Sequence, residues 1–470
     1  MGRDVVVVVP GILGSTLRHR GRMVWEPSAG AAVRAIRTLG RSVKALELPE
    51  GIGDGEPEPG GPGGDVEAVD VMPDLHVLPG IWVGNLGYSR LIAALERRCH
   101  LTPPQPHELD LLPNLIPFAY DWRLSCRVNG RRLAARVGPV LERWRAQGPA
   151  FADARLVLVC HSMGGLVARW FVEREGGAEV TRRIVTIGTP HRGALRALEQ
   201  LVNGVRKGIG PLGGDLTELA RSMPSMYELL PQYACVDTGG GELCRIGESP
   251  VPGLDTTMAE DGARFHLQLD GAAVAAHGAS DLCAIVGTRQ RTWTTARIVD
   301  GLVHPLYDIE GEDERGDATV PRLSATPGWM PPDSSGVRWV ADQHGALQRH
   351  GAVFDELERL LTAPSTVRRA TEGIELEAQV TELVLAGEAI EVRATVAGGE
   401  RVALRADVTD EAERPVTAIR LYRGQGGHRG VIEPLPPGAY QVRVTALDET
   451  AASVSPATAA VLVWDPEAGQ

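Results

Sequence analysis

The sequence predicts an α/β fold, a mostly parallel sheet with helices on both faces, followed by an all-β domain. Three observations predict it. Apolar, β-branched runs alternate with amphipathic helical segments in the first part of the 470-residue chain. One of these runs leads directly into a serine and two glycines, in "LVCHSMGG". Residues 367–470 instead contain short alternating runs separated by Gly and Pro turns.

The first predicted strand is the run of valines Val5–Val9. A continuous β-branched run is typical of a strand buried on both faces of a sheet. It leads into the turn "PGILGSTL", whose backbone N–H groups can point into a site and stabilise an oxyanion. A plain Pro-Gly turn is an equally good interpretation of these residues alone.

The next segment is mostly loop before a helix begins. "GDGEPEPGGPGGD" predicts a low-complexity loop with no core to bury. Leu78 and Trp82 then lie in a short apolar loop, for which a lipid-facing flap and a packed surface loop are both open interpretations. Leu91, Ile92 and Leu95 follow at helical spacing and predict one apolar helix face.

A second strand is predicted at Leu115–Tyr120. Asp121 and Arg123 follow it, and a structural ion pair above a packed Trp122 is favoured over a catalytic role. Arg131–Gln147 has apolar residues at helical spacing, which predicts an amphipathic helix.

The stretch "LVLVCHSMGGLV" has the pattern of a nucleophile elbow, a strand that turns sharply into a helix at a serine. The residues two before and two after Ser162 must be small, and here they are Cys160 and Gly164. Cys160 departs from the usual G-x-S-x-G pattern, although its side chain is small. The alternative is an ordinary strand–helix turn with a capping serine.

A further buried strand, Arg183–Ile187, ends in "GTPHRG". Ligands of parallel sheets bind beyond the carboxyl ends of the strands. Pro10–Leu13, Ser162 and Thr189–His191 all fall at such ends, so we expect them to lie near one another.

Residues 192–278 interrupt the alternation with the Met- and Leu-rich segment "LTELARSMPSMYELLPQYA" and Gly-rich loops. An insertion at this point would lie over the site as a cap. Exposed Met and Leu side chains would suit a lipid-facing surface, and buried ones would form the core of a helical subdomain. The sequence favours neither interpretation.

Asp317 follows in the tight turn "GDATVP", and His344 follows the last predicted sheet strand, Gly336–Ala341. The order Ser162, Asp317, His344 is the Ser–Asp–His order of α/β-hydrolases. A serine hydroxyl needs a base within hydrogen-bond reach, and the base needs an orienting carboxylate. We therefore predict these three residues as a catalytic triad.

Five histidines are candidates for the base. His344 is favoured because it directly follows a buried strand and precedes a helix. His161 adjoins the serine and should point away from the hydroxyl, and His191 lies in what resembles a structural loop. His304 lies in a hairpin, and His350 is expected inside the closing helix.

Asp317 competes with three other aspartates for the orienting role. Asp342 is too near His344 along the chain, and Asp313 lies in a charge run that is typical of a solvated face. Asp300 is the remaining candidate. Asp317 is favoured because the Gly-Asp turn and the strand start that follows fix its backbone.

The oxyanion hole is expected to use the backbone N–H of Met163, the residue after the nucleophile. The second donor should come from the "PGILGS" turn, with Ile12 and Leu13 as candidates. The sequence has no metal-ligand cluster, Walker loop or dinucleotide fingerprint, so no cofactor and no metal are implied.

Composition limits the partners. The net charge of −12 without a basic stripe argues against nucleic acid. No run approaches the ~18 apolar residues of a membrane-spanning helix, which leaves only transient contact with a membrane surface. The six cysteines show no C-x-x-C spacing, and no export signal is evident, so we expect a cytoplasmic protein in which Cys235 and Cys244 are free thiols.

Several motifs in order resemble the lecithin:cholesterol acyltransferase-like family, in its bacterial esterase and lipase branch: "VVVPGILGSTL", "FAYDWRLS", "HSMGGLVARWF", "TIGTPHRGA", "PSMYELLP", "GDATVP" and "QHGAL". The resemblance implies an α/β-hydrolase fold with a cap. By motif, it implies that Ser162 is the nucleophile, Asp317 the carboxylate and His344 the base, with Ile12 and Met163 in the oxyanion hole. Ala318 stands where this family usually has glycine.

The resemblance implies a serine acyl hydrolase or O-acyltransferase of lipid metabolism, acting on (phospho)lipid-type esters through an acyl-serine. Water or an alcohol would take the acyl group. Two alternatives remain open. One is a small-ester or thioester hydrolase without a lipid role, and the other is a non-catalytic scaffold on a hydrolase fold.

Two domains are expected. Residues 1–362 would form the α/β-hydrolase catalytic domain, with the cap insertion around 192–278. Residues 367–470 would form an immunoglobulin-like β-sandwich after the linker "TAPST". The second domain has no catalytic constellation, so we expect it to stabilise the chain or to bind a protein partner.

Overall fold

The computed structural model describes most of the chain. The described residues are 4–26, 44–74, 87–104, 112–207, 214–237, 239–276, 281–362, 376–381, 383–396, 402–410, 414–424, 427–447 and 457–464. Leu78 and Trp82, for which a lipid-facing flap was one interpretation, lie outside them.

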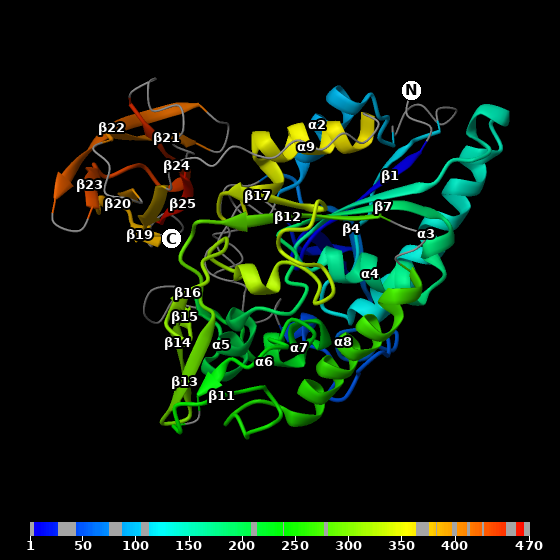
Figure 1. Ribbon diagram of the computed structural model, residues 1–470, viewed down its shortest axis with the longest axis horizontal. Helices are drawn as coiled ribbons and strands as arrows, with labels where there is room; N and C mark the ends of the chain where they lie inside the picture. The colour runs from blue at the N-terminus through cyan, green and yellow to red at the C-terminus, as the bar shows by residue number, and fades with distance from the viewer. Residues whose placement is uncertain are drawn as a thin grey trace.

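A parallel six-stranded sheet forms the centre of the first part of the molecule (Figure 1). Its strands pair in the order β17-β12-β7-β6-β1-β5, and every pairing is parallel. The strands are β1 (Val5–Val9), β5 (Leu115–Pro117), β6 (Leu156–His161), β7 (Thr181–Ile187), β12 (Asp281–Thr288) and β17 (Val337–Ala341). This sheet confirms the predicted α/β fold.

Helices cover both faces of this sheet. Figure 1 shows α2 (Ser89–Cys99) and α9 (Gly351–Thr362) together on one side, and α3 (Cys126–Arg145) and α4 (Gly164–Arg174) on the other. The valine run explains why both faces are covered. Val6 and Val8 pack into the core beneath α2 and α9, whereas Val5, Val7 and Val9 pack into the core beneath α3 and α4. The strand is therefore buried on both faces, as its composition predicted.

Several element ends differ from the prediction, among them that of β5, which ends at Pro117 and not at Tyr120. Helix α3 begins at Cys126 and not at Arg131, because the Ser125 side chain caps it by accepting a hydrogen bond from Val128 N at 3.1 Å. His350 lies just before α9 and not inside it.

The chain between β7 and β12 forms a helical cap beside the carboxyl ends of the strands (Figure 1). It contains α5 (Leu195–Asn203), α6 (Thr217–Ser222), α7 (Pro224–Tyr227) and α8 (Thr256–Ala276). Met223, Met226, Leu229 and Leu230 are each at most 3% exposed. These side chains are therefore the core of a helical subdomain and not a lipid-facing surface.

Small sheets surround this frame. β2 (Ser15–His19), β3 (Arg22–Trp25) and β4 (Val66–Val71) form one, and β13 (Thr295–Val299) and β14 (Leu302–Leu306) extend the short strands β10 (Val236–Asp237) and β11 (Leu243–Cys244) into another. The thiols of Cys235 and Cys244 are unpaired on this second sheet.

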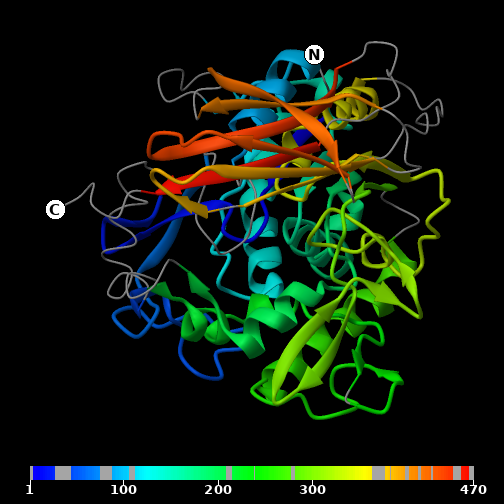
Figure 2. The ribbon, with the colours of Figure 1, turned by 90° about the vertical axis from the view of Figure 1, so that its left-hand side faces the viewer.

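The C-terminal part is a separate all-β unit (Figure 2). Its strands pair in the order β18-β20-β23-β22-β21-β24-β25-β19. Residues from both ends of this order share one hydrophobic core, among them Ile390 and Val392 on β20 and Val442 and Val444 on β24. The strands are β18 (Leu376–Val380), β19 (Leu383–Leu385), β20 (Ile390–Val396), β21 (Leu404–Asp410), β22 (Pro415–Gly424), β23 (Gly427–Ile432), β24 (Gly438–Ala446) and β25 (Ala457–Trp464). The all-β prediction is confirmed, and the immunoglobulin-like assignment stays a prediction.

Candidate active site

Ser162 lies on the sharp turn between β6 and α4. Its φ of +53° places it in the left-handed region, which is strained for a residue with a Cβ. The turn is fixed by two hydrogen bonds, from Ser162 N to the Ile187 carbonyl at 2.9 Å and from Thr189 Oγ1 to the Ser162 carbonyl at 2.8 Å. This geometry is that of a nucleophile elbow.

Gly164 is required at this turn. A Cβ at Gly164 would lie 2.3 Å from the Pro10 carbonyl oxygen and 2.5 Å from that of Val9. These are backbone atoms that cannot move aside. Cys160, which replaces the other elbow glycine, is fully buried in the core between β1 and β7, so its small side chain is accommodated.

The structure brings together Ser162 after β6, His344 after β17, and Asp317 from the loop that precedes β17. The Ser162 hydroxyl donates to His344 Nε2 at 2.8 Å, and His344 Nδ1 donates to Asp317 Oδ2 at 2.7 Å. All three side chains are buried, with 5%, 1% and 6% exposure for Ser162, Asp317 and His344. This arrangement lets the imidazole accept the hydroxyl proton while the carboxylate orients the ring.

The loop backbone holds Asp317 in a fixed orientation. Its Oδ1 accepts hydrogen bonds from Thr319 N at 3.0 Å and Val320 N at 2.7 Å. Its own carbonyl accepts one from His344 N at 2.8 Å. The Asp317 and His344 loops are thus joined through both backbone and side chain. One carboxylate oxygen is held by the backbone, and the other remains for the imidazole.

The "PGILGS" turn packs directly against the elbow. A Cβ at Gly11 would lie 2.8 Å from Ser162 Cβ. Within the described residues, the backbone N–H groups of Ile12, Leu13 and Met163 have no hydrogen-bond acceptor. Since all three residues are buried, these N–H groups are suited to receive an oxyanion.

Tyr88 and His161 connect this turn to the backbone of His344. Gly11 N donates to Tyr88 Oη at 2.8 Å, and Tyr88 Oη lies 2.8 Å from His161 Nδ1. His161 Nε2 lies 3.1 Å from the His344 carbonyl oxygen. A backbone N–H can only donate and a carbonyl can only accept, so Tyr88 donates to Nδ1 and Nε2 donates to the carbonyl.

This chain of hydrogen bonds requires a neutral His161. Burial and the neighbouring His344 ring lower the pKa of His161 to about 3, and the two ring centroids are 5.1 Å apart. His161 therefore adds no positive charge beside His344. Sequence reasoning missed Tyr88, because no local pattern links it to a residue 73 positions later.

The other candidate bases and carboxylates do not join the triad. His191 Nε2 bonds Thr186 Oγ1 at 3.1 Å, and burial lowers its pKa well below the usual value. His350 Nδ1 accepts from Ala352 N, and His304 lies on β14. Asp342 is buried, and it bonds the backbone N–H of Gln343 at 2.8 Å.

Two further sequence candidates remain. Asp300 and Asp313 lie on hairpin segments, where neither contacts His344. Asp121 and Arg123 form the expected buried ion pair, with 2.7 Å between Oδ2 and Nη2. This pair is structural, because Arg123 also donates to the carbonyl oxygens of Leu46 and Gly63.

An apolar cavity begins at the "PGILGS" turn and extends under the cap. It is lined by Ile12 and Leu13 of the turn, Trp25 and Trp122, and cap residues that include Met223 and Met226. With about 20 Å³ of space, it does not admit an acyl chain unless the cap moves.

The described part of the chain contains no group of three His, Cys, Asp or Glu side chains that could hold a metal ion. None of its helices is both long enough and apolar enough to cross a membrane.

The parallel sheet, the flanking helices and the serine at the turn after β6 define an α/β-hydrolase fold. Comparison with protein families then gives a more particular result. Residues 113–243 match the model of the lecithin:cholesterol acyltransferase family. This match, which includes the elbow and much of the cap, confirms the resemblance inferred from the sequence motifs.

Comparison with solved structures finds similarity to a lipase of Bacillus licheniformis, BlEst2. Its propeptide form is 13% identical over 74% of this chain and 86% of that chain, with a TM-score of 0.33. Its mature form is 16% identical over 53% and 79%, with a TM-score of 0.32. A PKD domain of the human receptor SorCS2 is 20% identical over 23% and 88%, with a TM-score of 0.16. The search of curated proteins gives no match.

Proposed function

We propose that this protein is a serine acyl hydrolase or O-acyltransferase that cleaves lipid-type acyl esters, phospholipids among them, through an acyl-serine. The hydrogen-bonded series Ser162–His344–Asp317 carries this proposal. The family match over residues 113–243 supports it independently of that geometry.

In the acylation step, Ser162 Oγ attacks the ester carbonyl carbon and its proton passes to His344 Nε2. The carbonyl oxygen becomes an oxyanion and accepts hydrogen bonds from the N–H groups of Met163 and Ile12. Asp317 stays ionised and stabilises the imidazolium. Collapse of the tetrahedral intermediate breaks the bond to the alkoxy oxygen, which takes the proton from His344 and leaves as an alcohol.

In the second step, His344 takes a proton from water or from an alcohol, whose oxygen attacks the acyl carbon. The second tetrahedral intermediate expels Ser162 Oγ, which regains the proton from His344. The products are a free acid and regenerated enzyme, or a new ester when an alcohol attacks. Both outcomes use the same residues.

The cavity beneath the cap supports a lipid-type acyl group. It begins at the two residues of the oxyanion turn, and its other lining residues are almost all apolar. With about 20 Å³ of space, it would receive an acyl chain on Ser162 Oγ only after the cap moves. The buried Met223 and Met226 supply flexible side chains that can adapt to it.

A fluorophosphonate probe tests the nucleophile. We expect covalent labelling of Ser162 in the intact protein, and loss of both labelling and esterase activity in Ser162→Ala. Ser125→Ala is the matched control, because Ser125 is another buried serine, whose Oγ accepts from Val128 N at the start of α3. An unlabelled Ser162, together with Ser162→Ala activity equal to wild type, would overturn the proposed enzyme function of Ser162, and no esterase activity in either protein would favour the scaffold interpretation.

Acyl-chain length and acceptor test the substrate. We expect kcat/KM on esters of one leaving group to rise from acetyl to octanoyl. Adding a long-chain alcohol to defined phospholipids then separates transfer, seen as a new ester, from hydrolysis. A preference for the shortest chain would instead favour a small-ester or thioester hydrolase.

A further inference from the structure

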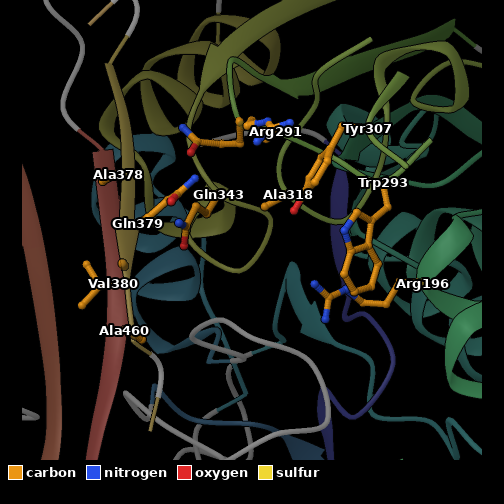
Figure 3. Close-up of a pocket in the computed structure, with 12 residues that line it drawn as sticks. Arg196, Arg291, Trp293, Tyr307, Ala318, Gln343, Ala378, Gln379, Val380 and Ala460 are labelled. Carbon is orange, nitrogen blue, oxygen red and sulfur yellow. The ribbon is translucent and has the colours of Figure 1, made fainter. Parts of the chain in front are cut away.

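A second cavity lies between the hydrolase part and the all-β unit (Figure 3). It has a volume of about 290 Å³. Figure 3 shows Arg196, Trp293 and Tyr307 on one side, and Gln379 and Val380 of the all-β unit on the other. The wall on that second side comes from β18 and β25, which contribute Ala378, Gln379, Val380, Ala459 and Ala460.

The charge of this cavity is positive. Two arginines line it, and none of the lining residues is acidic, although the whole chain carries a net charge of −12. The Arg196 guanidinium lies 4.9 Å from the centre of the Trp293 ring, and that of Arg291 lies 4.0 Å from the centre of the Tyr307 ring. Stacking orders both groups and leaves their N–H donors for another partner.

Neither arginine has a carboxylate partner among the described residues. Arg196 Nε is buried and has no hydrogen-bond acceptor in the part of the chain that the structure describes. The same holds for Nε2 of Gln290, a cavity-lining side chain that is 2% exposed. A buried donor without an acceptor costs free energy, so two such donors beside one cavity point to a ligand that accepts hydrogen bonds.

The cavity adjoins the loops that hold the triad. Ala318 and Gln343 line it, and they are the chain neighbours of Asp317 and His344. Gln290 and Gly316 exchange two backbone hydrogen bonds of 2.9 Å, so the loop that carries the unpartnered amide is joined to the Asp317 turn. A group bound in this cavity would therefore lie beside the two loops that carry Asp317 and His344.

We propose that this inter-domain cavity binds an anionic group of the ester substrate, a carboxylate or a phosphate, with the all-β unit as its outer wall. The proposal rests on the proposed acyl-ester activity. Arg196 and Arg291 supply the positive charge, and Gln290 supplies a neutral donor. Guanidinium groups match the planar oxygens of both anions. The all-β unit thus takes part in substrate selection.

The kinetic test uses octanoate esters of phenols whose para substituents differ in charge: 4-octanoyloxybenzoate, 4-octanoyloxyphenyl phosphate and the neutral methyl 4-octanoyloxybenzoate. The measured quantity is the ratio of kcat/KM for each anionic ester to that for the neutral ester.

We expect Arg196→Gln and Arg291→Gln each to lower this ratio by about tenfold, which is the loss expected when one charge-assisted hydrogen bond is removed. The control Arg420→Gln removes an exposed charge from β22 and should leave the ratio unchanged. The comparison of the two anionic esters distinguishes a carboxylate from a phosphate site.

A separate variant tests whether the all-β unit forms the outer wall of the anion site. Ala460→Glu places a carboxylate on β25 opposite the arginines, and we expect it to lower the same ratio by about tenfold through like-charge repulsion and competition for the guanidinium groups. Tyr422→Glu, at a side chain that is 70% exposed on β22, is the matched control. If Ala460→Glu and Tyr422→Glu give the same ratio, the wall assignment is wrong.

Direct binding separates this inference from the proposed function. Calorimetric titration of the full chain with inorganic phosphate and with benzoate should show binding by wild type that Arg196→Gln and Arg291→Gln weaken about tenfold. Phosphate or benzoate binding without any Ser162-dependent hydrolysis would overturn the proposed function and retain the anion site. Ser162-dependent hydrolysis with an unchanged ratio in both arginine variants would overturn the anion site alone.

Discussion

His161 donates its Nε2–H to the backbone carbonyl oxygen of His344 across 3.1 Å. The residue before Ser162 thus holds the backbone of the residue that we propose as the base. On its other side, His161 accepts from Tyr88, which in turn accepts from Gly11 N beside the oxyanion turn. One continuous chain of hydrogen bonds therefore connects the backbone of His344, the residue before Ser162 and the turn that we propose to carry oxyanion donors.

Tyr88→Phe should lower kcat by about tenfold to a hundredfold with little change in KM, because sub-ångström shifts of reacting groups cost this much. The variant leaves Gly11 N without an acceptor and His161 Nδ1 without a donor. Tyr233→Phe is the control, since Tyr233 is also buried and its Oη donates to a backbone carbonyl, that of Thr294. Steady-state kinetics and thermal unfolding of both variants separate positioning from folding. Equal kcat in both variants would refute the positioning role.

His161→Gln should retain most activity, because the amide can accept from Tyr88 through its oxygen and donate to the His344 carbonyl through its nitrogen. His161→Leu, of similar volume, can do neither, and we expect a loss of about tenfold or more in kcat. The pH profile of kcat/KM gives a second readout. A neutral His161 with a pKa of about 3 makes no contribution above pH ~5, so His161→Gln should keep the wild-type profile. A shifted acid limb in His161→Gln would show that His161 titrates in wild type.

The prediction from sequence succeeded where the signal is local. The valines Val5–Val9 indicated a strand buried on both faces, and the residues around Ser162 indicated the strand–helix turn. The structure also brings Asp317 and His344 to Ser162, the geometry expected from their order and their places after strands. These inferences need only periodicity, turn residues and the rule that parallel strands end at one edge of a sheet.

The features that the sequence did not predict depend on contacts between segments that are far apart in the chain. Such contacts leave no local pattern in a single sequence. Tyr88 reaches His161 across 73 positions. Met223 and Met226 have the same periodicity whether they face lipid or a core, and their burial is decided by α8 and the rest of the cap. β25 and Arg196 line the same cavity because the all-β unit packs against the hydrolase part, and no local sequence pattern encodes that packing.

Glu228 should make stability fall as the pH rises. Burial raises the pKa of its carboxyl to about 8, above the ordinary 4.5, although Cys126 N donates to it at 2.6 Å and Arg127 lies 3.5 Å away. The folded state therefore keeps a proton that the unfolded state has released. This stabilisation is complete below about pH 4.5 and is lost as the pH rises through about 8.

Glu228→Gln should flatten that dependence, because the amide carries no titrating proton. Urea unfolding at several pH values between about 5 and 8 measures the slope of the free energy of unfolding. Burial also raises the pKa of Asp342, to about 7, so part of the slope should remain. Glu218→Gln, on an α6 side chain that is 74% exposed, should keep the wild-type slope. An unchanged slope in Glu228→Gln would show that this carboxyl is ionised in the folded protein.

Ala318 occupies a backbone position that favours glycine. Its φ is +73°, in the left-handed region where a Cβ costs about 1–2 kcal/mol. The family that the sequence resembles usually has glycine here, and the backbone angle, not the side-chain volume, sets the cost of alanine. Ala318→Gly should therefore raise the free energy of unfolding by about 0.5 kcal/mol, after the greater freedom of glycine in the unfolded chain is subtracted.

Ala325→Gly is the control. Ala325 has a φ of −80°, so the same substitution there should lower the free energy of unfolding by about 0.5–1 kcal/mol. Chemical denaturation of the two variants gives the comparison, and destabilisation of the same size at both positions would contradict the left-handed geometry of Ala318.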